Sequence, residues 1–154
     1  MSASKAFSLA LRPVRGANAA LVAGLAVHAA QRDLIASNAD SLALAAAHAN
    51  MHARAIYAGE ALVGFALYAQ PGQAGRQDTY VLYRLMIAAG QQGQGYGRRA
   101  LGLLLDEMRA RGAGRVVLYY VPANARARRL YADAGFTEVG LDADGEMMAE
   151  CLLP

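Results

Sequence analysis

The passage from residue 79 to residue 108 constrains the fold more than any other part of the chain. Residues 79–87 are rich in Tyr, Val, Leu and Ile and predict a strand. Glycines follow at alternate positions, at Gly93, Gly95 and Gly97. After them apolar residues recur at helical spacing, at Ala100, Leu103, Leu104 and Met108. A strand that enters an amphipathic helix through a glycine-rich turn requires a helix packed on a sheet, so we expect a mixed α/β fold.

The rest of the chain continues this alternation. Further strands are expected at residues 8–12, 54–57, 62–68, 115–120, 136–139 and 146–153. Further helices are expected at residues 17–30, 41–49 and 125–134, with residues 38–40 supplying a turn and a helix cap. No internal repeat or linker interrupts the pattern, so we expect one domain over residues 1–154.

Composition excludes several classes of protein. The longest apolar stretch, residues 17–30, is shorter than the about 20 residues that a membrane span needs, so we expect no membrane insertion. Cys151 is the single cysteine and the spacings of zinc ligands are missing, so neither a disulfide nor a metal site is expected. With no signal-peptide pattern, the cytoplasm is the expected compartment. The formal charge of +3 suits a phosphate-bearing ligand but is too small to indicate nucleic acid.

The glycine-rich turn has the properties of an anion site. Glycines allow the backbone to approach a ligand closely, and the N-terminus of the following helix adds partial positive charge, which favours a pyrophosphate. Arg98 and Arg99 at the start of that helix oppose its dipole unless an anion lies between them. The spacing G-x-G-x-G differs from the Rossmann fingerprint and from the P-loop. The alternative is a flexible turn without a ligand.

Two blocks of sequence resemble the GNAT acetyltransferase superfamily. The first is Gln92-Gly93-Gln94-Gly95-Tyr96-Gly97, which is similar to the family signature Q/R-x-x-G-x-G/A. The second is similar to N-x-x-A-x-x-L-Y-x-x-x-G-F and consists of Asn124, Ala127, Leu130, Tyr131, Gly135 and Phe136. The blocks occur in the order and with the separation usual in that family. The resemblance implies a twisted mixed sheet of about six to seven strands, helices on both faces and a splayed strand pair at an acetyl-CoA site.

The resemblance also implies roles for particular residues. Acetyl-CoA would be the co-substrate, held by the backbone of the strand that precedes the turn, by the turn and by the second block. The residues expected to bind it are Leu85, Met86, Ile87, Gln92, Gly93, Gln94, Gly95, Tyr96, Gly97, Arg98, Asn124 and Tyr131. Tyr131 would be the catalytic acid that protonates the departing thiolate, because a phenol is protonated at neutral pH. Asn124 either bonds the pantetheine arm or caps the following helix.

Some arginines and histidines have no assigned role. One of Arg126, Arg128 and Arg129 is expected to reach a CoA phosphate, with no choice among them. His28, His48 and His52 are interpreted as structural or exposed, since they lack the spacing of metal ligands.

The acceptor is expected to be a small primary amine that attacks the thioester directly in a ternary complex. Shorter pieces, among them Val63-Gly64-Phe65 and Tyr83-Arg84-Leu85-Met86-Ile87, resemble the bacterial spermine/spermidine acetyltransferase group, which implies a polyamine. An amino acid, an aminoglycoside and a protein N-terminus remain alternatives. The general base is open among Glu60, Asp78, Glu146, Glu150 and a water held by Tyr83 or Tyr119. Cys151 is excluded as an acyl carrier because the terminal strand is remote from the turn in this fold.

Two functions of other classes compete with an enzyme. The first is a CoA-binding module without turnover, which the intact Tyr131 argues against. The second is a nucleic-acid binder, which is disfavoured because aromatic and basic residues do not interleave on one strand. The expected partner is therefore a small amine, with neither nucleic acid nor membrane, and the family resemblance adds a homodimer as an expectation.

Overall fold

The computed structural model describes residues 8–25, 38–72 and 76–154. Strands β1 to β7 span Leu9–Pro13, Met51–Ala58, Ala61–Ala69, Thr79–Ile87, Arg115–Tyr120, Thr137–Leu141 and Met147–Leu152. Helices α1 to α4 span Gly16–Ala23, Asn38–Ala47, Tyr96–Ala110 and Ala125–Asp133, and a short 3-10 turn, η2, spans Ala89–Gln91. The order of strands and helices agrees with the alternation expected from the sequence, and η2 is an addition to it.

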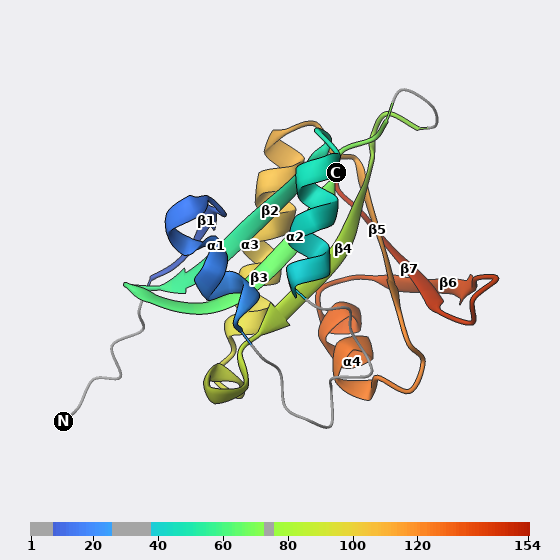
Figure 1. Cartoon of the computed structure of the whole chain (residues 1–154). Helices are drawn as coiled ribbons and strands as arrows, with labels where there is room; N and C mark the ends of the chain where they lie inside the picture. Colours follow the sequence, from blue (N-terminus) through green and yellow to red (C-terminus); the bar gives the residue numbers. More distant parts are fainter. Residues whose placement is uncertain (1–7, 26–37, 73–75) are drawn as a thin grey trace.

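In the described part of the chain the strands form one seven-stranded sheet in the order β1-β2-β3-β4-β5-β7-β6. Only the pair β4–β5 is parallel; the other neighbouring strands are antiparallel. Helices α1 and α2 cover one face over β2 and β3, and α3 lies on the opposite face (Figure 1). The expected mixed α/β fold with helices on both faces is therefore confirmed.

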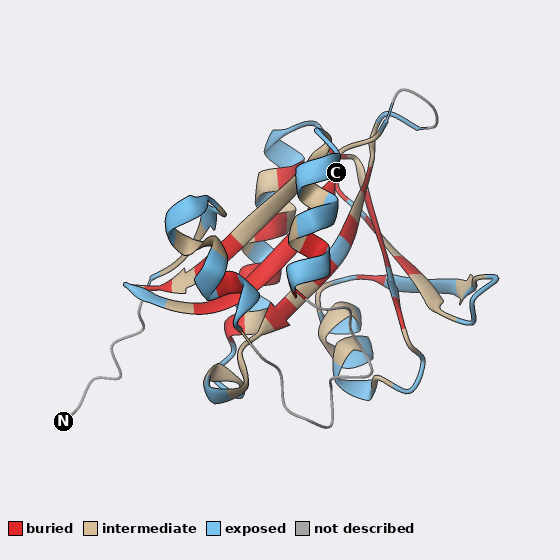
Figure 2. Ribbon diagram, in the orientation of Figure 1, coloured by how far each residue is buried: buried red, intermediate tan, exposed pale blue. Residues whose placement is uncertain are grey.

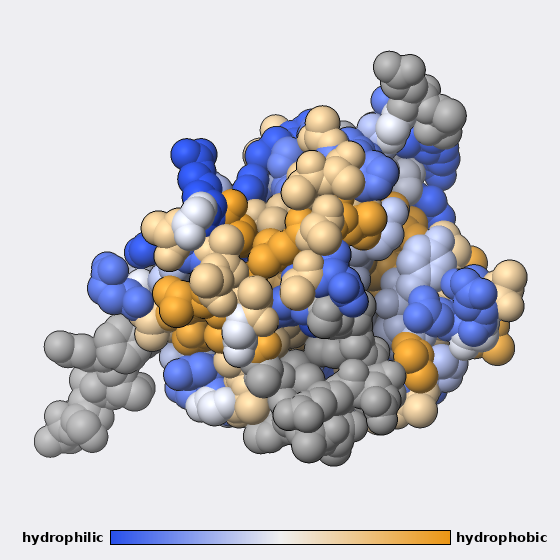
Figure 3. Space-filling view, viewed as in Figure 1, coloured by the Kyte–Doolittle hydropathy of each residue, from blue (hydrophilic) through white to orange (hydrophobic). Residues whose placement is uncertain are grey.

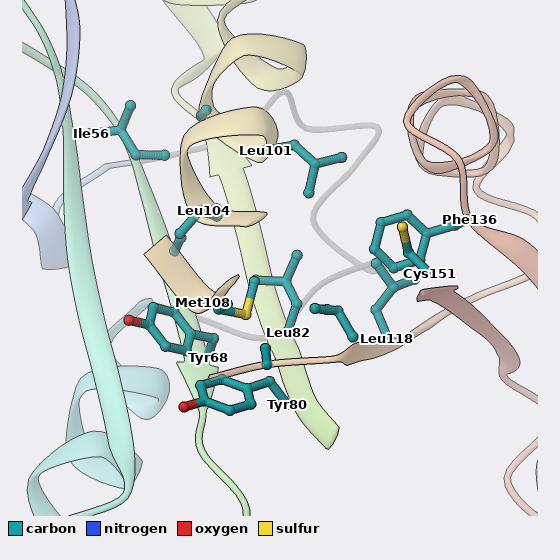
Figure 4. Close-up of a cluster of buried hydrophobic side chains, with 14 of the residues drawn as sticks. Ile56, Tyr68, Tyr80, Leu82, Leu101, Leu104, Met108, Leu118, Phe136 and Cys151 are labelled. Carbon is teal, nitrogen blue, oxygen red and sulfur yellow. The ribbon is translucent and has the colours of Figure 1, made fainter. Parts of the chain in front are cut away.

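The larger core lies between α3 and the sheet (Figure 4). Ala100, Leu101, Leu104 and Met108 of α3 are fully buried, because residues at this spacing share one face of a helix. Leu101 thus occupies the inward stripe where the sequence suggested Leu103, which is half-buried. Each buried leucine contributes about 1.5–3 kcal/mol, so α3 is anchored firmly with its N-terminus at the end of β4.

A second, smaller core fills the other face, under α1 and α2. Val22 of α1 packs there with Phe65, Leu67 and Met86 of the sheet. The buried residues of both layers concentrate in the central strands (Figure 2). On the outer side of this layer, apolar surface is exposed over α1 and α2 while hydrophilic side chains gather along the edges (Figure 3).

Strand β4 contains an irregularity that decides where its side chains point. Leu67 of β3 pairs with Arg84, but its neighbour Tyr68 pairs with Leu82, so Tyr83 is an extra residue in β4. Such a bulge reverses the alternation of side chains. Leu82 therefore joins the α3 core, whereas Arg84 lies opposite Leu67 on the α1–α2 face.

Strands β4 and β5 separate directly after this bulge. Their parallel pairing covers only residues 79–82 of β4 and 115–118 of β5. Beyond it β5 continues along β7, while residues 83–87 of β4 follow β3 in another direction (Figure 1). The splayed strand pair expected from the family resemblance is present in the structure.

Most strand boundaries differ from the sequence prediction by one or two residues, and β2 begins three residues earlier than expected, at Met51. Three helix boundaries also differ. Helix α1 ends at Ala23 with Gly24 as its C-cap, and residues 26–30 of the predicted helix lie outside the described residues. Asn38 belongs to α2 and is not part of a turn, because its side chain bonds tertiary partners instead of capping the helix. Helix α2 ends at Ala47, before the predicted 49. Among the described helices, none has the length and apolar character that a membrane crossing requires.

Candidate active site

A pocket of about 300 Å³ opens where β4 and β5 separate. Its walls are the end of β4, the turn before α3, the first residues of α3 and one side of α4. The predicted site residues that line it are Leu85, Met86, Ile87, Gln92, Gly93, Gly95, Tyr96, Gly97, Arg98, Asn124 and Tyr131. Gln94 does not line it; its side chain is exposed and donates to Gln91 Oε1 at 3.4 Å.

The turn before α3 has the backbone of an anion cradle. Gly93 and Gly95 have φ angles of +83° and +78°, a conformation that side-chain-bearing residues rarely adopt. A Cβ added at either glycine would meet no atom within 4 Å, so open space lies in front of both. Gly95 is also the N-cap of α3, where free N–H groups and the helix dipole favour negative charge.

The edge of β4 supplies main-chain groups to the same pocket. Ala88 N donates to Val63 O of β3 at 2.8 Å. Since backbone groups alternate between the two sides of an antiparallel strand, those of Leu85 and Ile87 point away from β3 into the gap. Gln92 Nε2 donates to the Ile87 carbonyl at 2.9 Å, consistent with this direction. The side chains of Leu85 and Ile87 pack against the α3 core, as the sequence suggested.

Side chains of α3 and α4 place charge around the pocket. Arg98 Nη2 forms an ion pair with Asp133 Oδ2 at 2.7 Å, with both side chains largely exposed. Arg126 Nη1 donates to Gln92 Oε1 at 2.8 Å. Of the three arginines left open by the sequence, Arg126 and Arg129 line the pocket. The third, Arg128, lies elsewhere and is bonded to Glu138.

Several lining residues were not predicted. They are Gln91, Ala127, Leu130 and Asp133. Ala127 and Leu130 belong to the second family block, and the helical spacing of residues 127, 130 and 131 was a signal that they share one side of α4. Asn124 N-caps α4, its Oδ1 accepting from Ala127 N at 3.1 Å, which is one of the two roles expected for it.

Tyr131 is half-buried and lines the pocket from α4. Its ring centroid lies 5.9 Å from that of Tyr120 and 5.7 Å from that of Phe136. Burial, and secondarily the neighbouring Tyr120, raise the pKa of Tyr131 to about 12. The hydroxyl is therefore protonated throughout the neutral range, which is the state a proton donor needs.

The four carboxylates considered as a base lie away from the gap. Glu60 is in the β2–β3 turn near Arg12. Asp78 precedes the paired end of β4, and Glu150 is paired with Arg115 at 2.6 Å at that same end. Glu146 lies in the β6–β7 hairpin.

Two tyrosines stand at the gap instead. Tyr83 and Tyr119 are the first residues beyond the last paired positions of β4 and β5, and their exposed fractions are 52% and 42%. Of the residues left open for proton removal, these two are the ones that flank the opening.

The remaining reactive side chains lie elsewhere. His52 contacts Gln70 Oε1 at 2.7 Å on β2, and His28 lies outside the described residues. Cys151 is buried on β7, and burial raises the pKa of its thiol. Within the described ranges no group of three His, Cys, Asp or Glu side chains could hold a metal ion.

The fold is shared with structures of known acetyltransferases. Spermidine N-acetyltransferase from Vibrio cholerae, solved with CoA and spermine, superposes with a TM-score of 0.76 at 17% identity, covering 94% of this chain and 95% of that one. An aminoglycoside acetyltransferase solved with coenzyme A gives a TM-score of 0.79 at 18% identity, covering 94% and 95%. At these identities the likeness concerns the fold.

Sequence comparison is more specific. A protein named mycothiol acetyltransferase, from Beutenbergia cavernae, is 48% identical over 65 residues, which are 42% of this chain. The aligned part spans only 22% of that relative's length. The model of the Acetyltransferase (GNAT) family matches residues 27–136, which include the turn, the open strand edge and the helix that carries Tyr131. The chain therefore belongs to the GNAT acetyltransferase family.

Proposed function

We propose that this protein is an N-acetyltransferase that transfers the acetyl group of acetyl-CoA to a primary amine of a small molecule. The observation that carries the proposal is the open main-chain edge of β4 beside a glycine turn with positive φ angles. An extended acyl-pantetheine arm needs backbone partners along its length, and a diphosphate needs converging N–H groups. The end of β4 and the glycine turn line the same pocket.

The residues present fit acetyl-CoA. Gly93, Gly95 and the N-terminus of α3 would hold the diphosphate, with Arg126 and Arg129 adding positive charge. The backbone of β4 in the gap would bond the pantetheine arm in the manner of an added strand. The pocket also offers apolar wall along β4 and α4, which suits the alkyl portions of the arm.

The bound thioester supplies an activated acetyl group, and the protein supplies position and protons. The amine nitrogen bonds to the acetyl carbon as the carbon–sulfur bond breaks, and the leaving sulfur takes the hydroxyl proton of Tyr131. An ammonium acceptor loses two protons in all. One of them replaces the proton that Tyr131 donated, and the other passes to solvent. We assign the removal of these protons to water held near Tyr83 and Tyr119 at the mouth of the gap.

The acceptor, the compartment and the assembly are further parts of the proposal. A polyamine follows from the sequence resemblance and is supported by the spermine-bound neighbour. Other small amines are alternative acceptors, because the similar proteins include an aminoglycoside acetyltransferase and a mycothiol acetyltransferase. Amino acids and protein N-termini are further alternatives. We expect one catalytic domain over residues 1–154 acting in the cytoplasm, and a homodimer remains an expectation from the family.

Release of free thiol tests the proposal directly. The protein is incubated with acetyl-CoA and a panel of polyamines, amino acids, aminoglycosides and peptides, and thiol is followed with a chromogenic disulfide. Acetyl-CoA affinity is measured in parallel by calorimetry. Amine-dependent thiol release supports the enzyme, whereas tight binding with a silent panel supports a CoA-binding module. Absence of acetyl-CoA binding refutes both.

A further inference from the structure

Helix α4, which carries Tyr131, is anchored less by burial than the other described α-helices. No residue of α4 is fully buried, whereas α1, α2 and α3 each contain at least one buried residue. Figure 2 shows only intermediate and exposed positions along α4. Ala127, Leu130 and Tyr131 pack against the larger core, but each is only partly buried. Polar contacts therefore take a larger part in placing this helix than in placing α3.

One carboxylate joins α4 to two strands of the sheet. Arg128 of α4 donates from Nε to Glu138 Oε1 at 2.6 Å and from Nη2 to Oε2 at 2.9 Å. This two-pronged contact fixes the plane of the carboxylate on β6. The hydroxyl of Tyr120 on β5 donates to the same Oε1 at 2.5 Å. Glu138 thus links α4, β6 and β5 through its two oxygens.

Tyr120 in turn contacts the ring of Tyr131. The two ring centroids are 5.9 Å apart with an angle of 31° between the planes, and Phe136 contacts the Tyr131 ring edge-on at 5.7 Å. The contacts form a closed loop from Arg128 through Glu138 and Tyr120 to Tyr131. Arg128 and Tyr131 are three residues apart on α4, so the loop begins and ends within one helical turn. Such a loop resists both a shift of α4 and a tilt of the Tyr131 ring.

The hydrogen bonds of this loop persist at neutral pH. The bonds from Arg128 and then from Tyr120 lower the pKa of Glu138, so its carboxylate is charged. Burial, and then the bond to Glu138, raise the pKa of Tyr120 to about 12, so its hydroxyl keeps the proton that it donates. Both partners are therefore in the required state under the conditions in which an acetyl transfer would run.

Folding stability alone gives this cluster a small role. The side chains of Arg128 and Glu138 are 52% and 35% exposed, and ion pairs of this kind contribute about 0–1 kcal/mol. A phenylalanine in place of Tyr120 would fill the same space and need no carboxylate. Position is a different matter, because a proton donor must come within hydrogen-bond reach of the leaving sulfur. A displacement of about 1 Å can lower a rate by roughly a hundredfold.

We propose that Glu138 and Tyr120 are positioning residues of the acetyl transfer. Glu138, oriented by Arg128, holds the phenol of Tyr120, and Tyr120 holds the ring of Tyr131 at the wall of the pocket. Neither residue touches a substrate; both act through Tyr131. This proposal rests on the proposed function, because it concerns the proton donor of that reaction.

The test asks whether the two residues act through the Tyr131 hydroxyl. Glu138→Ala and Tyr120→Phe are each made in the wild type and in Tyr131→Phe. In the wild type each should lower kcat by about tenfold and leave the dissociation constant of acetyl-CoA unchanged. In Tyr131→Phe neither should lower kcat further, because no hydroxyl remains to be positioned. Glu138→Gln should retain more activity than Glu138→Ala, since its amide oxygen can still accept from Tyr120.

Three results would overturn the proposal. The first is an unchanged kcat in both single variants. The second is an equal further loss of kcat in the Tyr131→Phe background, which would show that the residues act independently of the hydroxyl. The third is a weaker binding of acetyl-CoA in place of a lower kcat.

Glu150→Ala is the matched control. Glu150 of β7 pairs with Arg115 of β5 at 2.6 Å, so the variant also removes a carboxylate from a guanidinium beside β5, but at the end of the strand away from the gap. It should lose stability in thermal unfolding and keep the kcat of the wild type. An equal loss of kcat in Glu150→Ala would attribute the effect to general destabilisation and overturn the positioning role.

A measurement without turnover separates this proposal from the proposed function. If the wild type acetylates no amine, the proposed function fails, and the ring signal of Tyr131 is followed by NMR in protein with labelled tyrosine rings. The signal is assigned by its loss in Tyr131→Phe. Glu138→Ala should shift it and Glu150→Ala should not, whereas an unshifted signal in Glu138→Ala overturns the contact loop. Should Glu138→Ala fail to fold, Tyr120→Phe carries both comparisons with the same outcomes.

Discussion

Gly95→Ala separates the folding role of the glycine turn from its binding role. Gly95 has φ +78° and ψ 9° at the N-cap of α3, and an added Cβ would meet no atom within 4 Å. The substitution therefore creates no clash in the free protein. Its cost is that of a left-handed conformation for a residue with a side chain, about 1–2 kcal/mol. For a chain of this size that lowers Tm by about 2 to 8 °C.

The effect on binding should be larger than the effect on stability. The methyl group occupies the open space in which the diphosphate would lie against the N–H groups of the turn. Loss of one hydrogen bond to a charged group is worth about 1.5–3 kcal/mol, so acetyl-CoA should bind roughly tenfold to a hundredfold more weakly. Gly95→Asp adds negative charge at the same point and should abolish measurable binding.

Gly112→Ala provides the control for this experiment. Gly112 follows the C-terminus of α3 with φ +110°, and a Cβ there also meets open space. Both variants should lose similar stability in thermal unfolding, but only Gly95→Ala should weaken acetyl-CoA binding in calorimetry. Equal dissociation constants for the two variants would show that the diphosphate does not lie at this turn.

The remaining predictions concern the pocket wall and the sheet beneath it. Tyr131→Phe should lower kcat without changing acetyl-CoA affinity, and full activity would remove Tyr131 from the acid role. Burial raises the pKa of Tyr131 from 10.0 to about 12. The contribution of the neutral Tyr131 hydroxyl to stability is therefore complete below pH 10 and is lost as the pH rises to 12. Alkaline unfolding of Tyr131→Phe should not show this loss of stability. Asp133→Asn should tighten acetyl-CoA binding a few-fold by freeing Arg98, while the control Asp106→Asn should not, as calorimetry at low salt would show. Gly64→Ala should lower the free energy of unfolding by about 1–3 kcal/mol and weaken acetyl-CoA binding, because the added Cβ would collide with the backbone of β4. Unchanged stability in denaturant unfolding would contradict this packing.

Local chemistry made much of the fold predictable. Apolar spacing from Ala100 to Met108 identified α3, and its start was marked by the glycine turn. Hydrophobic runs located all the strands of the described sheet. The end of α1 was missed because apolar residues continue from Leu25 to Ala30 in the sequence, although Gly24 is a helix-ending signal. Asn38 was read as a cap because its tertiary partner, Arg84, is distant in the sequence.

The candidate site was predictable where a motif carries it and not where it depends on strand register. The glycines and Tyr131 belong to blocks with recognisable spacing, and the structure brings them to one pocket. Asp133 of α4 forms an ion pair with Arg98 of α3, and no local sequence pattern predicts this contact between two helices. Arg84 stands in an apolar strand, an anomaly visible in the sequence, but simple alternation from Leu82 would place it on the wrong face.

The additional residue at Tyr83 acts as a phase shift in β4. Upstream of it even-numbered side chains enter the α3 core, and downstream of it odd-numbered ones do. If Tyr83 instead took a regular place in the pairing with β3, Arg84 would share the face of Leu82 and its guanidinium would enter the α3 core. The offset of one residue therefore decides which of the two layers receives each side chain of β4 beyond Leu82.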